Sequence, residues 1–277
     1  LQGDAEVGTE MGENTDVDMI TFTGSTRVGQ SLMKAAATNV KKIGLELGGK
    51  SPNVIFADVD LDGAVEWAMI GIFFNQGAGS RIIIEESIHD EFVARLKKKA
   101  EAMTIGNPVN NPDIGPVITE KDMEKVLSYI KSGIEEGATL VTGGERYTEG
   151  ECAKGYFVRP TIFDNCTSDM KIVREEIFGP VVSIQTFKTE KEAIAMANDT
   201  VYGLAGAVFT SDITRAHRVI SELRAGITWI NCYNPTFNEA PWGGYKMSGI
   251  GRELGVHGIE EYQEVKQINI NLNPGIV

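Results

Sequence analysis

Short apolar runs rich in β-branched residues alternate with segments of helical periodicity along most of the chain. The runs that predict strands are Ile20–Phe22, Ile43–Leu47, Val54–Phe56, Arg81–Ile84, Ala138–Val141, Val181–Phe187, Ala205–Phe209 and Ile227–Ile230. The segments that predict helices are Arg27–Thr38, Leu61–Phe74, His89–Met103, Glu120–Glu136, Glu190–Ala197 and Ile213–Leu223. Such alternation is typical of βα units that build a largely parallel sheet. The sequence therefore predicts an α/β fold.

Two local patterns refine this picture. Thr189 stands three residues before Glu192, which is the spacing of a capping box and marks the start of a helix. Near the end of the chain, Val265–Leu272 largely alternates apolar and polar residues. That alternation predicts a strand that pairs at a sheet edge, with another subunit as its partner.

Composition places the chain among globular proteins and excludes several partners. Of 277 residues, 42% are hydrophobic and 23% charged, which is close to globular averages, and no apolar run approaches the ~18 residues needed to span a bilayer. The net charge of −13 repels phosphate backbones and anionic lipid headgroups. We therefore expect neither a nucleic-acid partner nor a membrane partner.

The cysteines and histidines predict neither a disulfide framework nor a metal site. Cys152, Cys166 and Cys232 form no CxxC pair, and buried inert thiols are the default interpretation. The three histidines have no metal-ligand spacing from one another or from a cysteine. These observations favour a reducing, cytoplasmic location and no metal.

Two candidate residues stand where strands end. Gly24 and Ser25 join a strand to a helix, where backbone N–H groups could hold a phosphate or Ser25 could be a plain helix cap. Glu46 ends the next strand, so it is either a general base or a solvated glutamate near a sheet edge.

Later in the chain, Glu175-Glu176 precedes a Gly-Pro turn and is typical of charge at a helix end. Trp242 stands in a Pro/Gly-rich loop, where it lines a pocket or anchors the loop. The GxG of Ser248–Gly251 follows no predicted strand, so we expect a loop there.

Taken together, four segments in this order resemble the aldehyde dehydrogenase superfamily over essentially the whole chain: Phe22-Thr23-Gly24-Ser25, Leu45-Glu46-Leu47-Gly48-Gly49-Lys50, Glu175–Pro180 and Pro241–Arg252. Within that superfamily, Trp229–Lys246 is most similar to betaine aldehyde dehydrogenases. The resemblance implies a Rossmann-type cofactor domain, of which only part is present, and an α/β catalytic domain. It divides the chain into residues 1–48, 49–247 and 248–277, the last being a return segment with an oligomerisation strand.

The resemblance also implies a reaction and a role for each motif residue. A cysteine thiolate attacks an aldehyde, hydride passes to NAD or NADP, and a glutamate-activated water hydrolyses the thioester. Glu46 matches the general base, and Trp242 matches a position that lines the aldehyde pocket. The residues that match cofactor contacts are Gly24, Ser25, Leu47, Glu176 and Phe178. Betaine aldehyde is the suggested substrate, and a homodimer or homotetramer is the suggested assembly.

Two departures from the family pattern bear on activity. The family carries its nucleophile in a stretch resembling N-Q-G-Q-V-C-S-A-G-S-R, whereas here Asn75-Gln76-Gly77 runs directly into Ala78-Gly79-Ser80-Arg81, so four residues with the cysteine have no counterpart. The segments that relatives carry before the position of Leu1, which include an oxyanion-hole asparagine and a lysine near the adenosine ribose, have no counterpart either. Two interpretations follow: the chain is an inactive relative that acts as a structural subunit, or the 277 residues omit pieces of an active enzyme. We favour omission.

Overall fold

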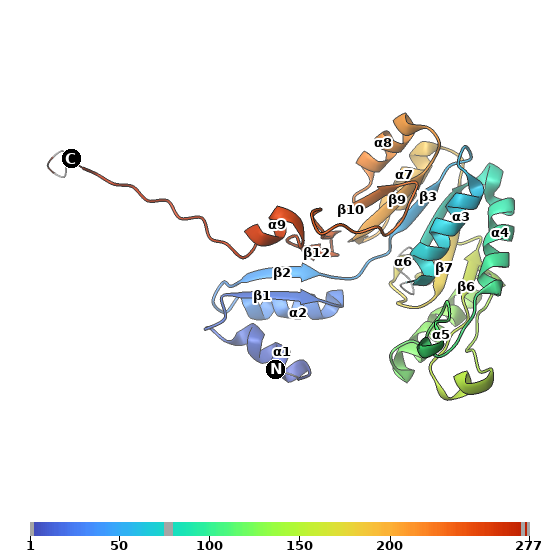
Figure 1. Cartoon of the computed structure of the whole chain (residues 1–277), viewed down its shortest axis with the longest axis horizontal. Helices are drawn as coiled ribbons and strands as arrows, with labels where there is room; N and C mark the ends of the chain where they lie inside the picture. The colour runs from blue at the N-terminus through green and yellow to red at the C-terminus, as the bar shows by residue number, and fades with distance from the viewer. Residues whose placement is uncertain (1–2, 75–79, 273–274, 276–277) are drawn as a thin grey trace.

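The computed structural model describes residues 3–74, 80–272 and 275. Two main sheets organise these residues, a large one that carries most of the chain and a small one formed near its two ends (Figure 1). A third sheet pairs only β8 (Tyr202–Gly203) and β11 (Tyr245–Lys246), which run antiparallel. The predicted break in the nucleophile motif, between Gly77 and Ala78, lies outside the described residues.

The large sheet has seven strands in the order β10-β9-β3-β4-β7-β6-β5. Its strands are β3 (Pro52–Ile55), β4 (Arg81–Glu85), β5 (Thr139–Thr142), β6 (Thr161–Asp164), β7 (Val181–Phe187), β9 (Ala205–Phe209) and β10 (Ile227–Ile230). All neighbouring pairs are parallel except β5 with β6, which is antiparallel. The predicted α/β fold with a mainly parallel sheet is therefore confirmed.

Side chains of the central strands alternate between the two faces of this sheet, which explains their continuous hydrophobic runs. Ile55 and Ile82 pack against α3 (Leu61–Met69) and α4 (His89–Ala102), whereas Val54 and Ile83 pack against α7 (Glu190–Asn198) and α8 (Ile213–Glu222). A further cluster joins α5 (Glu120–Glu135) and α6 (Lys171–Arg174) to β6 and β7. Helices thus cover both faces.

The small sheet pairs β1 (Met19–Thr23) with β2 (Lys42–Glu46) in parallel, and β12 (Gly249–Ile250) joins β2 antiparallel. Helices α1 (Ala5–Glu13) and α2 (Thr26–Ala36) lie beneath it, and α9 (Gly255–Glu260) lies above it (Figure 1). The prediction of a loop at Ser248–Gly251 is therefore wrong in part, because Gly249 and Ile250 form β12. Gly249 has φ +154°, and a Cβ there would lie 2.1 Å from the Leu45 carbonyl oxygen, so glycine is needed for this pairing.

Most predicted helices and strands agree with the structure within a few residues. The capping box of Thr189 and Glu192 is confirmed at the start of α7. The helix expected over Leu61–Phe74 ends at Met69 and continues as a π-helical turn, Ile70–Phe74. Hydrophobic periodicity did not predict the short elements α1, α6, α9, β6, β8 (Tyr202–Gly203), β11 (Tyr245–Lys246) and β12. Short 3-10 turns lie at Glu86–Ile88, Pro108–Asn110 and Gly150–Lys154.

The end of the chain forms an arm that leaves the body of the molecule (Figure 1). Residues 263–271 have neither helix nor strand, and the side chains of Val265, Ile268, Ile270 and Leu272 are exposed. The strand predicted over Val265–Leu272 is therefore not formed within this chain, because a lone extended segment has no neighbour for its backbone groups. Among the described helices, none is both long enough and apolar enough to cross a membrane.

Candidate active site

The candidate site begins where β1 and β2 end together. Thr23 and Glu46 are register partners in this parallel pair, and the Gly24 N–H donates to the Glu46 carbonyl at 2.9 Å. The chain then turns into α2, whose first turn is capped by Ser25, because its Oγ accepts from the Val28 N–H at 3.4 Å. Glu46 and Gly24 therefore lie at the carboxyl ends of parallel strands, the edge where α/β sheets commonly bind ligands.

Glu46 is a buried carboxyl group with unusual electrostatics. Its residue is 7% exposed, and its Oε2 has no hydrogen-bond partner among the residues that the structure describes. Burial, followed by the nearby Glu253 carboxylate, raises the pKa of Glu46 to about 7, while the Arg252 guanidinium and the Gly244 N–H oppose that rise. A carboxylate with a pKa near neutrality is suited to accept a proton.

The chain passes from β2 directly into β3, so the carboxyl end of the small sheet faces the amino end of the large one. Within this connection the Gly49 N–H donates to Glu176 Oε1 at 3.1 Å. Gly48 allows that approach, since a Cβ there would lie 2.5 Å from Glu176 Oε2. Phe178 lies two residues after Glu176, has φ +61° and is 65% exposed. Such a backbone in a non-glycine residue often marks a functional position.

Trp242 is held next to Glu253 by its backbone. Its backbone forms an antiparallel bridge with Glu253, in which each N–H donates to the other carbonyl at 2.7 Å. The indole is half-buried and lies 6.2 Å from the Trp229 ring, whose Nε1 donates to the Pro235 carbonyl at 3.0 Å. Trp242 therefore both anchors its loop and presents an aromatic surface.

These segments enclose one cavity of about 640 Å³, which we call the Trp242 cavity. Each residue predicted for base, cofactor or substrate contact lines it: Gly24, Ser25, Glu46, Leu47, Glu176, Phe178 and Trp242. The structure adds Asp122 and Lys125 from α5, together with Glu253. Asp122 and Lys125 are three residues apart and share a helix face, but this spacing is also typical of solvated helix surfaces. The sequence therefore carried no separate signal for them.

None of the three cysteines lines the Trp242 cavity. Cys166 is 7% exposed, and burial raises the pKa of its thiol to about 12. Cys152 is also buried, and burial raises the pKa of the Cys232 thiol. Thiols that stay protonated at neutral pH are poor nucleophiles. The inert character predicted for Cys166 and Cys232 agrees with these shifts.

Comparison with known proteins decides which family this geometry represents. A sequence profile described as "Aldehyde dehydrogenase family" matches residues 1–268. The chain belongs to the aldehyde dehydrogenase family. Its sequence is 51% identical to betaine aldehyde dehydrogenase of Bacillus subtilis (strain 168), over 99% of this chain and 57% of that protein.

Other aldehyde dehydrogenases are almost as similar. Identity is 50% to aminoaldehyde dehydrogenase 1, peroxisomal, of Pisum sativum, over 95% of this chain and 53% of that protein. It is also 50% to aldehyde dehydrogenase 1A1 of Gallus gallus, over 96% of this chain and 52% of that protein. The chain thus spans about half the length of the relatives it matches, and their names cover several aldehydes.

Solved structures of Staphylococcus aureus betaine aldehyde dehydrogenase have the same fold. An apo structure of a point mutant of that enzyme superposes with a TM-score of 0.97 at 47% identity, covering 100% of this chain and 56% of that one. A complex of the enzyme with NAD⁺ superposes with a TM-score of 0.92 at 46% identity, covering 95% of this chain and 53% of that one. The aldehyde dehydrogenase fold predicted from the motifs is thereby confirmed.

Proposed function

We propose that this chain contributes the general base, the nicotinamide end of the cofactor site and the substrate pocket to NAD(P)⁺-dependent oxidation of an aldehyde. In the balanced reaction, the aldehyde, water and NAD(P)⁺ give the carboxylic acid, NAD(P)H and a proton. The observation that carries the proposal is Glu46, a buried carboxyl with a pKa raised to about 7 on the wall of the Trp242 cavity. Near neutral pH a fraction of Glu46 is ionised and can take a proton from an attacking water.

The residues present fit a nicotinamide cofactor. The exposed turn of Gly24 and Ser25 at the start of α2 suits the pyrophosphate, because backbone N–H groups and the helix dipole favour negative charge there. The Glu176 carboxylate and the Lys125 ammonium line the Trp242 cavity and could bind ribose hydroxyls. Phe178 adds an exposed ring to the same cavity. When bound, the cofactor supplies the hydride acceptor. The NAD⁺ in the S. aureus complex supports the choice of NAD or NADP.

Betaine aldehyde is the substrate that we propose first. It carries a quaternary ammonium group, and the face of Trp242 would attract such a cation with about 0.5 to 2 kcal/mol. The name of the B. subtilis relative supports this choice, but the P. sativum and G. gallus relatives are nearly as similar. Replacing Trp242 with Leu should therefore lower turnover of betaine aldehyde more than turnover of a neutral aldehyde of similar size. Equal losses of turnover for the two aldehydes would show that Trp242 contributes only packing.

The thiol required for a thioester has no counterpart in this sequence. The alternative function is therefore a catalytically inactive subunit that keeps the fold and the ability to assemble. A variant with Gln-Val-Cys-Ser inserted between Gly77 and Ala78 separates the two, because it restores the family stretch. We expect NADH absorbance to rise with aldehyde and NAD⁺ in the insertion variant and not in the parent.

Further substitutions make that experiment decisive. In the insertion variant, Glu46→Gln should abolish steady-state turnover, and replacing the inserted cysteine with Ser should do the same. Turnover by the parent chain would show that the reaction proceeds without the thiol. A folded insertion variant that binds NAD⁺ but stays silent would favour the inactive subunit.

We also propose how the chain is divided and assembled. Residues 1–48 would belong to the cofactor domain, 49–247 to the catalytic domain and 248–277 to a return segment with an oligomerisation strand. The exposed arm supports pairing of Val265–Leu272 with a second copy, as a dimer or tetramer. A cytoplasmic location stays a prediction.

A further inference from the structure

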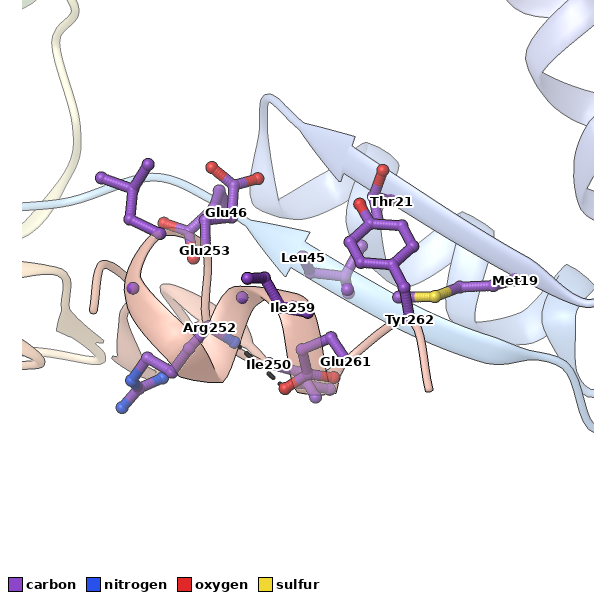
Figure 2. A pocket seen from close by; sticks show the side chains of 14 residues that line it. Met19, Thr21, Leu45, Glu46, Ile250, Arg252, Glu253, Ile259, Glu261 and Tyr262 are labelled. Carbon is purple, nitrogen blue, oxygen red and sulfur yellow. Dashed lines mark hydrogen bonds between the residues drawn. The ribbon is translucent and has the colours of Figure 1, made fainter. Parts of the chain in front are cut away.

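A second cavity of about 280 Å³ lies above the small sheet, and we call it the Tyr262 cavity. Figure 2 shows it between the strands β1 and β2 and the helix α9. Its apolar wall is built by Met19, Leu45, Ile250, Ile259 and Tyr262. The Tyr262 side chain stands over the strands and presents a ring to this space (Figure 2).

The polar part of this cavity is acidic. Glu46, Glu253 and Glu261 all line it, and the carboxyl groups of Glu46 and Glu253 gather at one end (Figure 2). Glu46 and Glu253 also line the Trp242 cavity, so they form the wall between the two cavities. Because Glu46 is only 7% exposed and its Oε2 has no partner among the described residues, it presents an unpaired acceptor at this wall.

The nearby Arg252 guanidinium favours the charged form of Glu46, but its hydrogen bonds go to backbone carbonyls. Arg252 Nη1 donates to the Gly251 carbonyl at 2.7 Å and to the Gly244 carbonyl at 3.3 Å, and the guanidinium lies 5.4 Å from the Tyr245 ring centroid. In Figure 2 its side chain points away from Glu46 and Glu253. The contact with Glu261 is made by the Arg252 backbone N–H at 3.2 Å, so it uses no side-chain charge.

From this combination we propose that the Tyr262 cavity binds a small alkylammonium cation. Carboxylates and an aromatic ring attract the positive charge, and the apolar wall suits its alkyl groups. A bare metal ion would need several oxygen ligands in place of Met19, Leu45 and Ile250, so it fits this wall poorly. The site is separate from the substrate pocket and does not depend on the aldehyde reaction.

Occupancy of this site is coupled to the ionisation of Glu46. A cation at the wall favours the charged carboxylate, so its affinity should rise as the pH rises through about 7. The charged groups near Glu46 are Glu253, Arg252 and Glu261 around the Tyr262 cavity, and Asp122, Lys125 and Glu176 around the Trp242 cavity. By reciprocity, the bound cation makes Glu46 a carboxylate at lower pH.

Calorimetric titration with choline tests the proposal, with its neutral carbon isostere 3,3-dimethylbutan-1-ol as the matched ligand. Measurements use the Trp242→Leu background in matched sodium chloride, so that the other cavity lacks its aromatic face. We expect choline to bind at least about tenfold more tightly than the isostere. Adding Tyr262→Leu or Glu261→Gln should weaken choline binding, and circular dichroism checks the fold of each variant. Tyr262 is 69% exposed, which makes its replacement compatible with folding.

Three outcomes would overturn the proposal. One is that choline does not bind to Trp242→Leu at millimolar concentration although the unsubstituted protein binds it, which places the cation in the Trp242 cavity. Another is equal affinity for choline and its isostere, which would show that the positive charge does not contribute to binding. The third is choline binding that neither Tyr262→Leu nor Glu261→Gln alters.

Discussion

The Gly49 N–H donates a hydrogen bond to Glu176 Oε1 across 127 residues of chain. This contact joins the connection after β2 to the segment before β7. It holds the Glu176 carboxylate at the Trp242 cavity, where we propose that the cofactor ribose binds. The distance between base and cofactor site therefore depends on how closely these two segments approach each other.

Gly48→Ala should disturb that approach without unfolding the protein. The new Cβ would lie 2.5 Å from Glu176 Oε2, which is the flexible end of a side chain and can move. We expect NAD⁺ affinity to fall about tenfold, the equivalent of one charge-assisted hydrogen bond, while unfolding free energy changes by no more than about 1 kcal/mol. Fluorescence titration with NAD⁺ and urea unfolding measure the two quantities.

Gly8→Ala provides the matched control for this substitution. Gly8 lies within α1, and a Cβ there would meet no atom within 4 Å. It should leave NAD⁺ affinity unchanged and stabilise the helix by about 0.5 to 1 kcal/mol. An unchanged affinity in Gly48→Ala would contradict a role for Glu176 in cofactor binding.

The raised pKa of Glu46 makes protein stability depend on pH. Between its ordinary value of 4.5 and its folded value of about 7, the folded state binds more protons than the unfolded state. Stability contributed by Glu46 therefore falls as the pH rises through this window. Glu46→Gln removes the dependence and should stabilise the protein at pH 8 by roughly 1 to 2 kcal/mol after discounting for solvent screening, with little effect at pH 4.5.

Urea unfolding at several pH values measures this difference, and exposed Glu124→Gln on α5 serves as control. Glu253→Gln should act in the same direction as an added positive charge: it removes a repelling carboxylate and lowers the pKa of Glu46. The pH range over which Glu46 affects stability should then become narrower, with a lower upper limit. A constant difference between Glu46→Gln and the parent from pH 4.5 to 8 would show that Glu46 titrates normally.

The sequence predicted the local elements well because hydrophobic periodicity and caps act over a few residues. Val54, Ile55 and Phe56 show this, since consecutive side chains reach opposite hydrophobic clusters of the large sheet. The position of the site was predicted only in part. Glu46 ends a strand of the small sheet, as expected, but Glu176 precedes β7, so the large sheet contributes its amino ends. Hydrophobic periodicity does not predict how the two sheets meet.

Long-range packing accounts for what the sequence left open. Ser248 Oγ donates to the Gly48 carbonyl at 2.6 Å over 200 residues and brings Glu253 to Glu46. Lys50 is 1% exposed, its Nζ has no hydrogen-bond partner among the described residues, and burial lowers its pKa to about 7. A lysine beside two glycines gives no sign of such burial. Only the family resemblance linked Glu176 and Trp242 to Glu46 in advance.

His89 should stabilise the protein at low pH. Its Nε2 and Nδ1 each lie 2.8 Å from a carboxylate oxygen, of Asp164 and Asp90 respectively. Burial alone would lower the pKa of His89, but the hydrogen bonds with Asp164 and Asp90 outweigh it and raise the pKa above 6.5. This stabilisation is fully present below pH 6.5 and is lost as the pH rises through the folded value.

His89→Gln should therefore cost about 1 kcal/mol at pH 6, and less at pH 9, once solvent screening is considered. Thermal unfolding across this range measures the change. Exposed His217→Gln on α8 serves as the control for a histidine replacement. A cost that does not fall with pH would assign His89 a packing role alone.

Removing the exposed arm should change the assembly of the protein and leave its fold intact. Ile268, Ile270 and Leu272 are 74%, 75% and 85% exposed, and their two-residue spacing would place them on one face of a strand. A chain that ends after Glu264 keeps the ion pair between Lys42 Nζ and Glu264 Oε1 at 2.8 Å, so the root of the arm stays attached.

If the arm pairs with a second copy, light scattering after size-exclusion chromatography should give a multimer for the parent and a monomer for the truncated chain. Ile270→Lys should weaken the multimer in the full-length arm, because a buried charge at the pairing surface is costly, whereas Gln267→Lys on the opposite face should not. Equal masses for parent and truncated chain would place the subunit contact elsewhere. Loss of helical circular dichroism on truncation would instead show that the arm stabilises the chain's own fold.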